Sequence, residues 1–423
     1  MKKLLYQGIF WRGLNYLTVF MVTIVIARLF KAGDSGEINY LVNNLALLIL
    51  ITTFSLESAT TYYSAKEEIS QPVLISTSLL MVLLCMMVSA IATKLFFRPG
   101  ESFAWIPAIL YCGGIALINY FTGLFSSHYN YILPNLVSVI VNLCIVVITM
   151  VWPAELVADD ASLFIKIYFA SFLVTGTSLT VLYMRKYGGI VKFASTAELK
   201  KLFGYAGFAL LTNVIVFLVY RVDYWFVNRN CTPEQLGNYI QVSKLVQIFL
   251  LVPGVLAGVI FTTTAKETAH EHLRNTQLLS RLLLSAYVAV LVMLVFVGKW
   301  LFPFVYGESF GLMYIPFVLV IPGIITLSTL SLVAAFNAGK GRISLNLAGA
   351  VFALVIIVTG NMIFSARFGI YAAAIVSSAG YTGYLFYVLF RLKSTYPEIQ
   401  MRDFFIPALK DFNLLKSLFI RAK

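Results

Sequence analysis

Two opposite charges stand out in the stretch YRVDYWFVNR, which runs from Tyr220 to Arg229 at the end of a long apolar segment. Arg221 and Asp223 are two residues apart, about 200° around a helix, so they cannot pair with each other. A guanidinium group offers fork-shaped donors and a permanent charge, which suit it to holding an anion such as a diphosphate. The alternative is that the Arg221 side chain extends along the apolar surface and places its charge in water.

Asp223 then needs a different partner. The next apolar segment carries Lys244, which we expect at a similar depth, with Gln247 beside it. An ion pair between Asp223 and Lys244 would make both charges tolerable among apolar residues. We expect this pair to be structural, with a role in proton or substrate coupling as the alternative.

Polar residues also mark the N-terminal segments. Arg12 and Asn15 share one side of the first apolar segment, and Asn39, Asn43 and Glu57 share one face of the second. Such a stripe faces the interior of a helix bundle or water rather than lipid. Glu57 is either a carboxylate at the membrane surface or a coupling group. The candidates for a substrate cavity are Arg12, Asn15, Asn39, Asn43, Arg221, Lys244 and Gln247, and those for an ion pair or coupling are Asp223 and Glu57.

The amino-acid composition indicates which type of structural element carries these residues. Of 423 residues, 60% are hydrophobic and only 12% are charged, against about a quarter charged in soluble proteins. The apolar residues form runs of about 20, the length that crosses a bilayer as a helix. They lack the alternation that barrel strands require. The sequence therefore predicts an all-α integral membrane protein.

Twelve membrane-spanning helices are expected, joined by short polar connections. Their predicted ranges are 8–30, 38–63, 73–97, 103–127, 131–152, 162–184, 202–227, 238–263, 279–304, 312–335, 343–366 and 370–391. Most of the 31 Lys and Arg residues fall on one predicted side, together with both termini. The positive-inside rule places that side in the cytoplasm, and its anionic lipids account for the net charge of +13 without nucleic acid.

The second and eighth spans resemble each other, which indicates an internal repeat. The segments Gly36–Glu67 and Gly237–Glu267 both begin with Gly and a nearby Asn-Tyr and both end in Ala-Lys-Glu, about 200 residues apart. Six spans separate them, so the two halves share an orientation and should be related by an axis along the membrane normal. We expect a six-helix lobe over 1–184, a basic cytoplasmic linker over 185–201, a second six-helix lobe over 202–391 and a basic cytoplasmic tail over 392–423. Two facing lobes are the plan of a transporter.

Three segments resemble those of a known family. DYWFVNRNCTPEQLGNYIQVSKL (Asp223–Leu245) is similar to the hairpin of spans seven and eight in the polysaccharide flippases. ARLFKAGDSGEINYLVNNL (Ala27–Leu45) looks like the equivalent hairpin of the first lobe, and FGIYAAAIVSSAGYTGYLFYVLF (Phe368–Phe390) resembles the last span of that family. These flippases belong to the multidrug/oligosaccharidyl-lipid/polysaccharide exporter superfamily.

The resemblance implies a flippase of the O-antigen, capsule or exopolysaccharide type in the cytoplasmic membrane of a bacterium. Its substrate would be an undecaprenyl-diphosphate-linked oligosaccharide, moved by alternating access. A polysaccharide polymerase and chain-length proteins would be partners. The resemblance implies no catalytic residues, metal or cofactor, and it leaves H⁺ or Na⁺ coupling open.

The alternative is a multidrug or cation exporter of the same superfamily. Such a site should be rich in acids, whereas the charges within the spans here are mainly basic. An enzyme that polymerises polysaccharide usually carries a large outer loop, and no predicted outer loop is longer than about ten residues. The sequence therefore favours transport of an anionic substrate.

Overall fold

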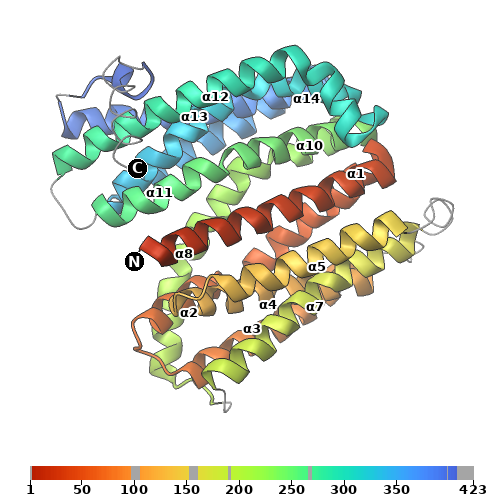
Figure 1. The fold of residues 1–423 in the computed structure, drawn as a ribbon, viewed down its shortest axis with the longest axis vertical. Coiled ribbons are helices and arrows are strands. Elements are labelled where there is room, and N and C mark those ends of the chain that lie inside the picture. Colours follow the sequence, from red (N-terminus) through yellow and green to blue (C-terminus); the bar gives the residue numbers. More distant parts are fainter. Residues whose placement is uncertain are drawn as a thin grey trace. The chain divides into compact units, whose positions relative to one another are not determined.

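The chain is mostly helical in the part that the structure, a computed structural model, describes: residues 2–96, 105–151, 161–188, 192–264, 269–397 and 399–406 (Figure 1). Ten helical stretches in these ranges are long and apolar enough to cross a membrane. Two of them, Phe10–Thr52 and Ile343–Thr395, have 43 and 53 residues, against about 20 for one crossing. Each is kinked, at Lys31 and at Gly369, where the backbone leaves helical geometry. Two crossings in each are consistent with the predicted twelve, and the all-helical membrane fold class is confirmed.

The chain divides into two compact units. Unit 1 comprises Met1–Lys31 and Tyr40–Val214, and unit 2 comprises Ala32–Asn39 and Ile215–Lys423. The short segment Ala32–Asn39 thus packs with unit 2 although its neighbours in sequence belong to unit 1. The boundaries expected for the lobes, linker and tail stay a prediction. Most of the tail (407–423) and the second Ala-Lys-Glu triplet (265–267) lie outside the described residues.

Unit 1 is a helix bundle around α4. Its elements are α1 (Lys2–Thr52), α2 (Leu56–Ala65), α3 (Gln71–Phe96), α4 (Trp105–Ser127), α5 (Ile132–Val151), α7 (Ala161–Tyr187) and the first part of α8 (Thr196–Arg221). Helix α4 packs against α2, α3 and α7, and its Tyr120, Phe121 and Phe125 side chains are fully buried. This core fixes the helices that carry the polar residues of unit 1.

A backbone break separates α1 from α2. Phe54 and Ser55 adopt left-handed conformations, with φ of 55° and 51°. The Tyr120 hydroxyl donates to the Thr53 carbonyl at 3.2 Å, and the Asn213 amide donates to the Ser55 hydroxyl at 3.2 Å. These bonds help to satisfy backbone and side-chain groups where the helix is interrupted. The straight helix expected over 38–63 is therefore wrong, and its polar face cannot be extended from Asn43 to Glu57.

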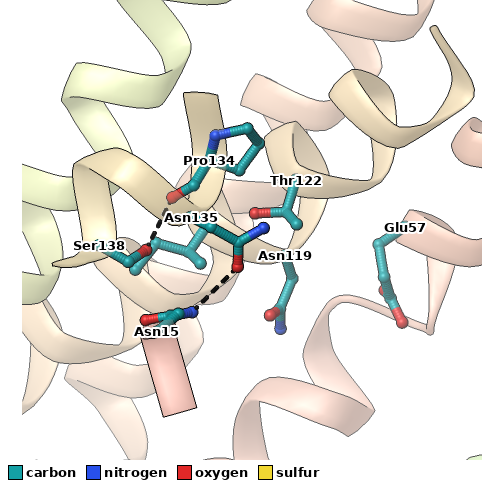
Figure 2. A pocket seen from close by; sticks show the side chains of 8 residues that line it. Asn15, Glu57, Asn119, Thr122, Pro134, Asn135 and Ser138 are labelled. Atoms are coloured by element: carbon teal, nitrogen blue, oxygen red, sulfur yellow. Dashed lines mark hydrogen bonds between the residues drawn. The ribbon is translucent and has the colours of Figure 1, made fainter. Parts of the chain in front are cut away.

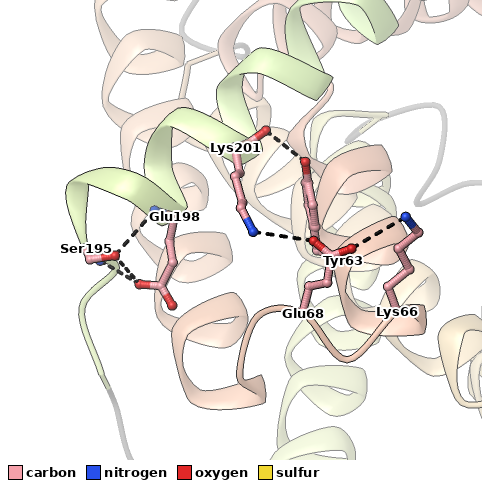
Figure 3. A network of polar contacts seen from close by, with 6 residues as sticks. All are labelled: Tyr63, Lys66, Glu68, Ser195, Glu198 and Lys201. Atoms are coloured by element: carbon pink, nitrogen blue, oxygen red, sulfur yellow. Dashed lines mark hydrogen bonds and ion pairs between the residues drawn. The ribbon is translucent and has the colours of Figure 1, made fainter.

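The start of α8 is fastened to the loop that follows α2 (Figure 3). The Ser195 hydroxyl accepts from the Glu198 backbone amide, and the Glu198 carboxylate accepts from the Ser195 backbone amide, which is a capping box. Glu68 lies between two cations, with its oxygens 3.4 Å from Lys66 Nζ and 3.5 Å from Lys201 Nζ. Exposed ion pairs of this kind contribute about 0–1 kcal/mol each. The capping box therefore does more than the ion pairs of Glu68 to determine where α8 begins.

Unit 2 is built around α13. Its elements are α9 (Asp223–Asn230), α10 (Pro233–Phe249), α11 (Leu251–Thr264), α12 (Ala269–Tyr306), η1 (Glu308–Met313), α13 (Tyr314–Gly339), α14 (Ile343–Thr395) and η2 (Met401–Phe404), preceded by the last turns of α8. Helix α13 packs against α11, α12 and α14. Element η2, in the predicted tail, is held on α12, because Ser280 Oγ donates to the Phe404 carbonyl and Arg281 donates to the Asp403 carbonyl.

Helix α10 meets the Ala32–Asn39 segment at two glycines. A Cβ atom on Gly237 would lie 1.8 Å from the Ala32 carbonyl oxygen, and one on Gly36 would lie 2.7 Å from the Gly237 nitrogen. Only glycine permits so close an approach of two backbones. A capping box of Thr232 and Gln235, with Pro233 at the first helical position, fixes where α10 begins. The glycine contact and the cap together set the position of Lys244 farther along α10.

Candidate functional site

A pocket with a volume of about 390 Å³ lies within unit 1. Its lining comes from α1, α2, α4 and α5, and consists of Asn15, Glu57, Ile118, Asn119, Thr122, Pro134, Asn135 and Ser138. Figure 2 shows Asn119 and Thr122 between the Asn15–Asn135 pair and Glu57. Three amides, two hydroxyls and one carboxylate therefore line one concave surface, and among the described residues no Lys, Arg or His is part of the lining.

A ladder of amides fixes one wall of this pocket. Asn15 Nδ2 donates to Asn135 Oδ1 at 3.3 Å, and Asn135 Nδ2 donates to the Tyr131 carbonyl at 2.7 Å. Asn142 Nδ2 donates to the Thr18 hydroxyl at 3.1 Å and to Asn15 Oδ1 at 3.4 Å. These bonds join α1 to α5 and hold the amides in defined orientations. The wall is therefore organised without a ligand.

Glu57 occupies the opposite side of the pocket. It lies in the first turn of α2, which packs tightly on α4: a Cβ atom on Gly123 would lie 2.2 Å from Thr61 Oγ1. Glu57 Oε2 is buried and has no hydrogen-bond partner among the described residues. A buried carboxylate oxygen without a donor costs free energy, so Glu57 has an unmet hydrogen-bond requirement at the edge of the pocket.

In unit 2, Lys244 has a neutral partner. Its Nζ atom donates to Asn39 Oδ1 at 2.7 Å, and the amide of Asn39 is oriented by its own bond to the Ser35 carbonyl at 2.7 Å. Both side chains are partly buried. Among the described residues, the ion pairs with side-chain atoms within 4 Å are those of Glu68. The charge of Lys244 is thus stabilised by an amide dipole rather than by a carboxylate.

The Arg221 side chain contacts α10 close to Lys244. Its guanidinium donates to Gln247 Oε1 at 3.4 Å and lies 5.7 Å from the centre of the Phe217 ring. Gln247 is three residues after Lys244, and residues with this spacing are neighbours on a helix surface. The two cations therefore gather near one part of α10.

Asp223 is held by two hydroxyl groups. It is 1% exposed, and its Oδ2 atom accepts from the hydroxyls of Tyr239 and of Ser377, the latter at 2.8 Å. The expected ion pair between Asp223 and Lys244 is wrong, because each side chain takes another partner. A small pocket lined in part by Tyr220, Tyr239 and Ser377 lies beside this group.

The predicted site residues fall into both units. Unit 1 holds Arg12, Asn15, Asn43 and Glu57, and unit 2 holds Asn39, Arg221, Asp223, Lys244 and Gln247. Asn15 and Glu57 share the 390 Å³ pocket, which the sequence did not predict because the break before α2 reorients Glu57. Arg12 is exposed and lies over the Tyr131 ring at 5.4 Å, and Asn43 is fully buried.

Several polar residues of these sites were missed. They are Asn119, Thr122, Asn135 and Ser138 in unit 1 and Tyr239 and Ser377 in unit 2. Each lies within an apolar span, and the amides Asn119 and Asn135 are uncommon enough there to have served as a signal. The hydroxyl residues carry no such signal, since Ser, Thr and Tyr are frequent in membrane helices.

The fold is similar to that of solved structures of membrane transporters, at low sequence identity. The lipid II flippase MurJ, in an inward closed conformation, superposes with a TM-score of 0.71 at 14% identity, covering 97% of this chain and 92% of that chain. An inward-facing multidrug resistance MATE family transporter of the MOP superfamily superposes with a TM-score of 0.69 at 12% identity, and the match covers 91% of this chain and 96% of that chain.

A third similar structure is a mutant form of the Vibrio cholerae MATE transporter VcmN. It gives a TM-score of 0.66 at 11% identity and covers 94% of this chain and 97% of that chain. No family model and no curated protein sequence matches the chain. The shared fold and the ten apolar helical stretches make this a multi-pass membrane protein.

Proposed function

We propose that this chain is a flippase for a lipid-linked oligosaccharide. It moves an undecaprenyl-diphosphate-linked unit of O-antigen, capsule or exopolysaccharide across the bacterial cytoplasmic membrane by alternating access, and it is not an enzyme. The fold shared with the lipid II flippase MurJ supports this class of function. Both termini face the cytoplasm, and a polymerase and chain-length proteins receive the product.

The observation that carries the proposal is the pairing of Lys244 with a neutral amide. A lysine at the centre of a membrane helix costs about 2.5–3.5 kcal/mol on insertion scales. Lys244 lies near a second cation, Arg221, which reaches the same helix face through Gln247. A diphosphate carries the negative charge that two such cations would bind, and Asn39 and Gln247 add amide groups beside it.

Asp223 is the group that we propose for coupling to H⁺ or Na⁺. It is a buried carboxylate with hydroxyl partners rather than a cation, so its charge is available to balance a bound proton or metal cation. Glu57 is the second coupling candidate, in unit 1.

The alternative function is export of cationic compounds. The pocket of unit 1 favours it, since the described residues of its lining include one carboxylate and no basic residue. MATE transporters share the fold as well. The two functions differ in the charge of the cargo and can be separated directly.

The test is transport by the purified full chain in proteoliposomes. The cargo is a polyprenyl-diphosphate lipid with a fluorescent neutral oligosaccharide, and a cationic dye is assayed in parallel. Lys244→Ala should reduce lipid movement at least tenfold and Lys244→Arg should retain most of it, because the charge is kept. Lys166→Ala is the matched control, since Lys166 lies in a membrane helix but is exposed. Dye export without lipid movement would favour the alternative.

A further inference from the structure

We propose that the pocket of unit 1 binds a sugar residue of the cargo and that Glu57 makes this site selective for neutral or amino sugars over acidic sugars. This inference rests on the proposed function and adds a specificity to it. A uronic acid is the sugar class that the site would exclude.

The groups that line the pocket match the hydroxyl groups of a sugar. Each of the three asparagine amides can donate and accept hydrogen bonds, as can the hydroxyls of Thr122 and Ser138. Asn119 is exposed, and neither Asn119 nor Thr122 uses its side chain in a hydrogen bond within the described part of the chain. A sugar ring presents donors and acceptors around its rim, so it can satisfy several of these groups at once.

The size of the pocket agrees with a sugar and not with a bare ion. Its volume of about 390 Å³ falls in the range of about 300–1,000 Å³ typical of small-molecule sites. One water molecule occupies about 30 Å³ in the liquid. A metal cation would leave most of this space to water and would contact only part of the lining.

The wall opposite Glu57 is already organised. Asn15, Asn135 and Asn142 hold one another through the hydrogen bonds that join α1 to α5. An organised wall binds a ligand with a smaller loss of side-chain entropy. Glu57 faces this wall across Asn119 (Figure 2), so a sugar bound to the amides would present its far edge to the carboxylate.

Glu57 sets the charge preference. As a lining residue, Glu57 presents a carboxylate that can accept from a sugar hydroxyl or from the ammonium group of an amino sugar. A carboxylate on the sugar would meet a like charge, and within the described part of the chain no Lys, Arg or His lines the pocket to balance it. The pocket therefore favours neutral and amino sugars on electrostatic grounds.

The experiment compares three polyprenyl-diphosphate lipids that differ in one sugar only: glucose, glucosamine or glucuronic acid. Transport is measured at pH 7.5 with the full chain in proteoliposomes. We expect the glucose and glucosamine lipids to move at least tenfold faster than the glucuronic acid lipid. In Glu57→Gln this ratio should fall to about twofold, whereas Glu57→Asp should retain most of it. Glu37→Gln, which removes an exposed carboxylate outside the pocket, should leave the ratio unchanged.

The outcomes separate this inference from the proposed function. If no lipid moves under any condition, the flippase proposal fails. If all three lipids move equally fast in the unsubstituted protein, the function stands and the sugar selectivity is overturned. Transport by Glu57→Gln could also become independent of an H⁺ or Na⁺ gradient while the sugar ratio stays unchanged. That result would overturn the sugar selectivity and would make the pocket an ion site.

Discussion

Lys244 and Asp223 show how single residues carry charge inside this membrane protein. Lys244 is bound by the amide oxygen of Asn39, and Asp223 by the hydroxyls of Tyr239 and Ser377. Neither partner bears an opposite charge. The residue types could be recognised from the sequence. The pairing could not, because Asn39 is 205 residues from Lys244 and Ser377 is 154 residues from Asp223.

The bond from Tyr239 to Asp223 should be worth more than a bond to a neutral acceptor. Tyr239→Phe removes one hydroxyl donor to a buried carboxylate, and we expect a loss of about 1–3 kcal/mol in unfolding free energy. Tyr314→Phe is the matched control, because its hydroxyl donates to the backbone carbonyl of Val295 at 2.8 Å. It should cost about 0.5–1.5 kcal/mol. Thermal unfolding in detergent would measure both, and a larger loss for Tyr314→Phe would contradict this account.

His128 should make the folding stability of the protein depend on pH. It lies in the connection between α4 and α5, stacks on the Tyr187 ring at 4.2 Å and contacts the Tyr183 hydroxyl at 3.1 Å. Burial, together with Lys186, lowers the pKa of His128 from its ordinary value, and Glu67 opposes this shift. The unfolded chain therefore binds more protons than the folded one near pH 6.5 and just below, so this contribution to stability is present above that range and is lost as pH falls.

The expected result is a melting temperature that decreases from pH 7.5 to pH 5.5, with a shallower decrease in His128→Gln. Thermal scans of both proteins at matched ionic strength provide the measurement. An equal slope for the two would show that other groups cause the pH dependence.

At the scale of elements, apolar runs predicted where helices lie but not where they break. The runs of about 20 residues placed the crossings, since a membrane requires continuous helical backbone. No Gly or Pro, the usual sequence signals of a helix break, occurs at the break at Phe54 and Ser55. It depends on tertiary bonds from Tyr120 and Asn213. The break places Glu57 in the pocket of unit 1, which is why that pocket could not be predicted.

The contact between Gly36 and Gly237 is the element-scale feature most open to test. Gly237→Ala would place a methyl group 1.8 Å from the Ala32 carbonyl oxygen, so the Ala32–Asn39 segment must move away from α10. We expect a loss of about 1–3 kcal/mol, as for other overpacked sites, and weaker binding of Lys244 to Asn39. A Cβ atom at Gly254 would meet no described atom within 4 Å, so Gly254→Ala should leave the melting temperature unchanged or raise it. Equal effects of the two substitutions would contradict the close contact.

At the scale of the whole molecule, an even number of crossings fixes the relation between the termini. The predicted twelve crossings would put both ends on the same side, and the distribution of Lys and Arg predicts that this side is the cytoplasm. The fold itself is shared with MurJ and with MATE transporters at 11–14% identity. The helical membrane fold was readable from the sequence because it depends on the apolar pattern alone.

The predicted orientation can be checked with reporter fusions. Green fluorescent protein at either terminus should fluoresce in bacterial cells, and alkaline phosphatase at either terminus should be inactive. A fusion of the phosphatase after Gly307, between α12 and α13, should be active because that connection lies on the other predicted side. Activity of the phosphatase at one terminus only would require an odd number of crossings.

The measurement that tests the central claim most directly is the rate at which the purified chain moves a polyprenyl-diphosphate-linked oligosaccharide across a liposome bilayer, beside Lys244→Ala and Lys244→Arg. The account predicts movement by the unsubstituted protein and by Lys244→Arg, and a loss of at least tenfold in Lys244→Ala with an unchanged melting temperature. Equal movement by all three proteins would contradict the proposed role of Lys244. Export of a cationic dye with no lipid movement would contradict the flippase proposal.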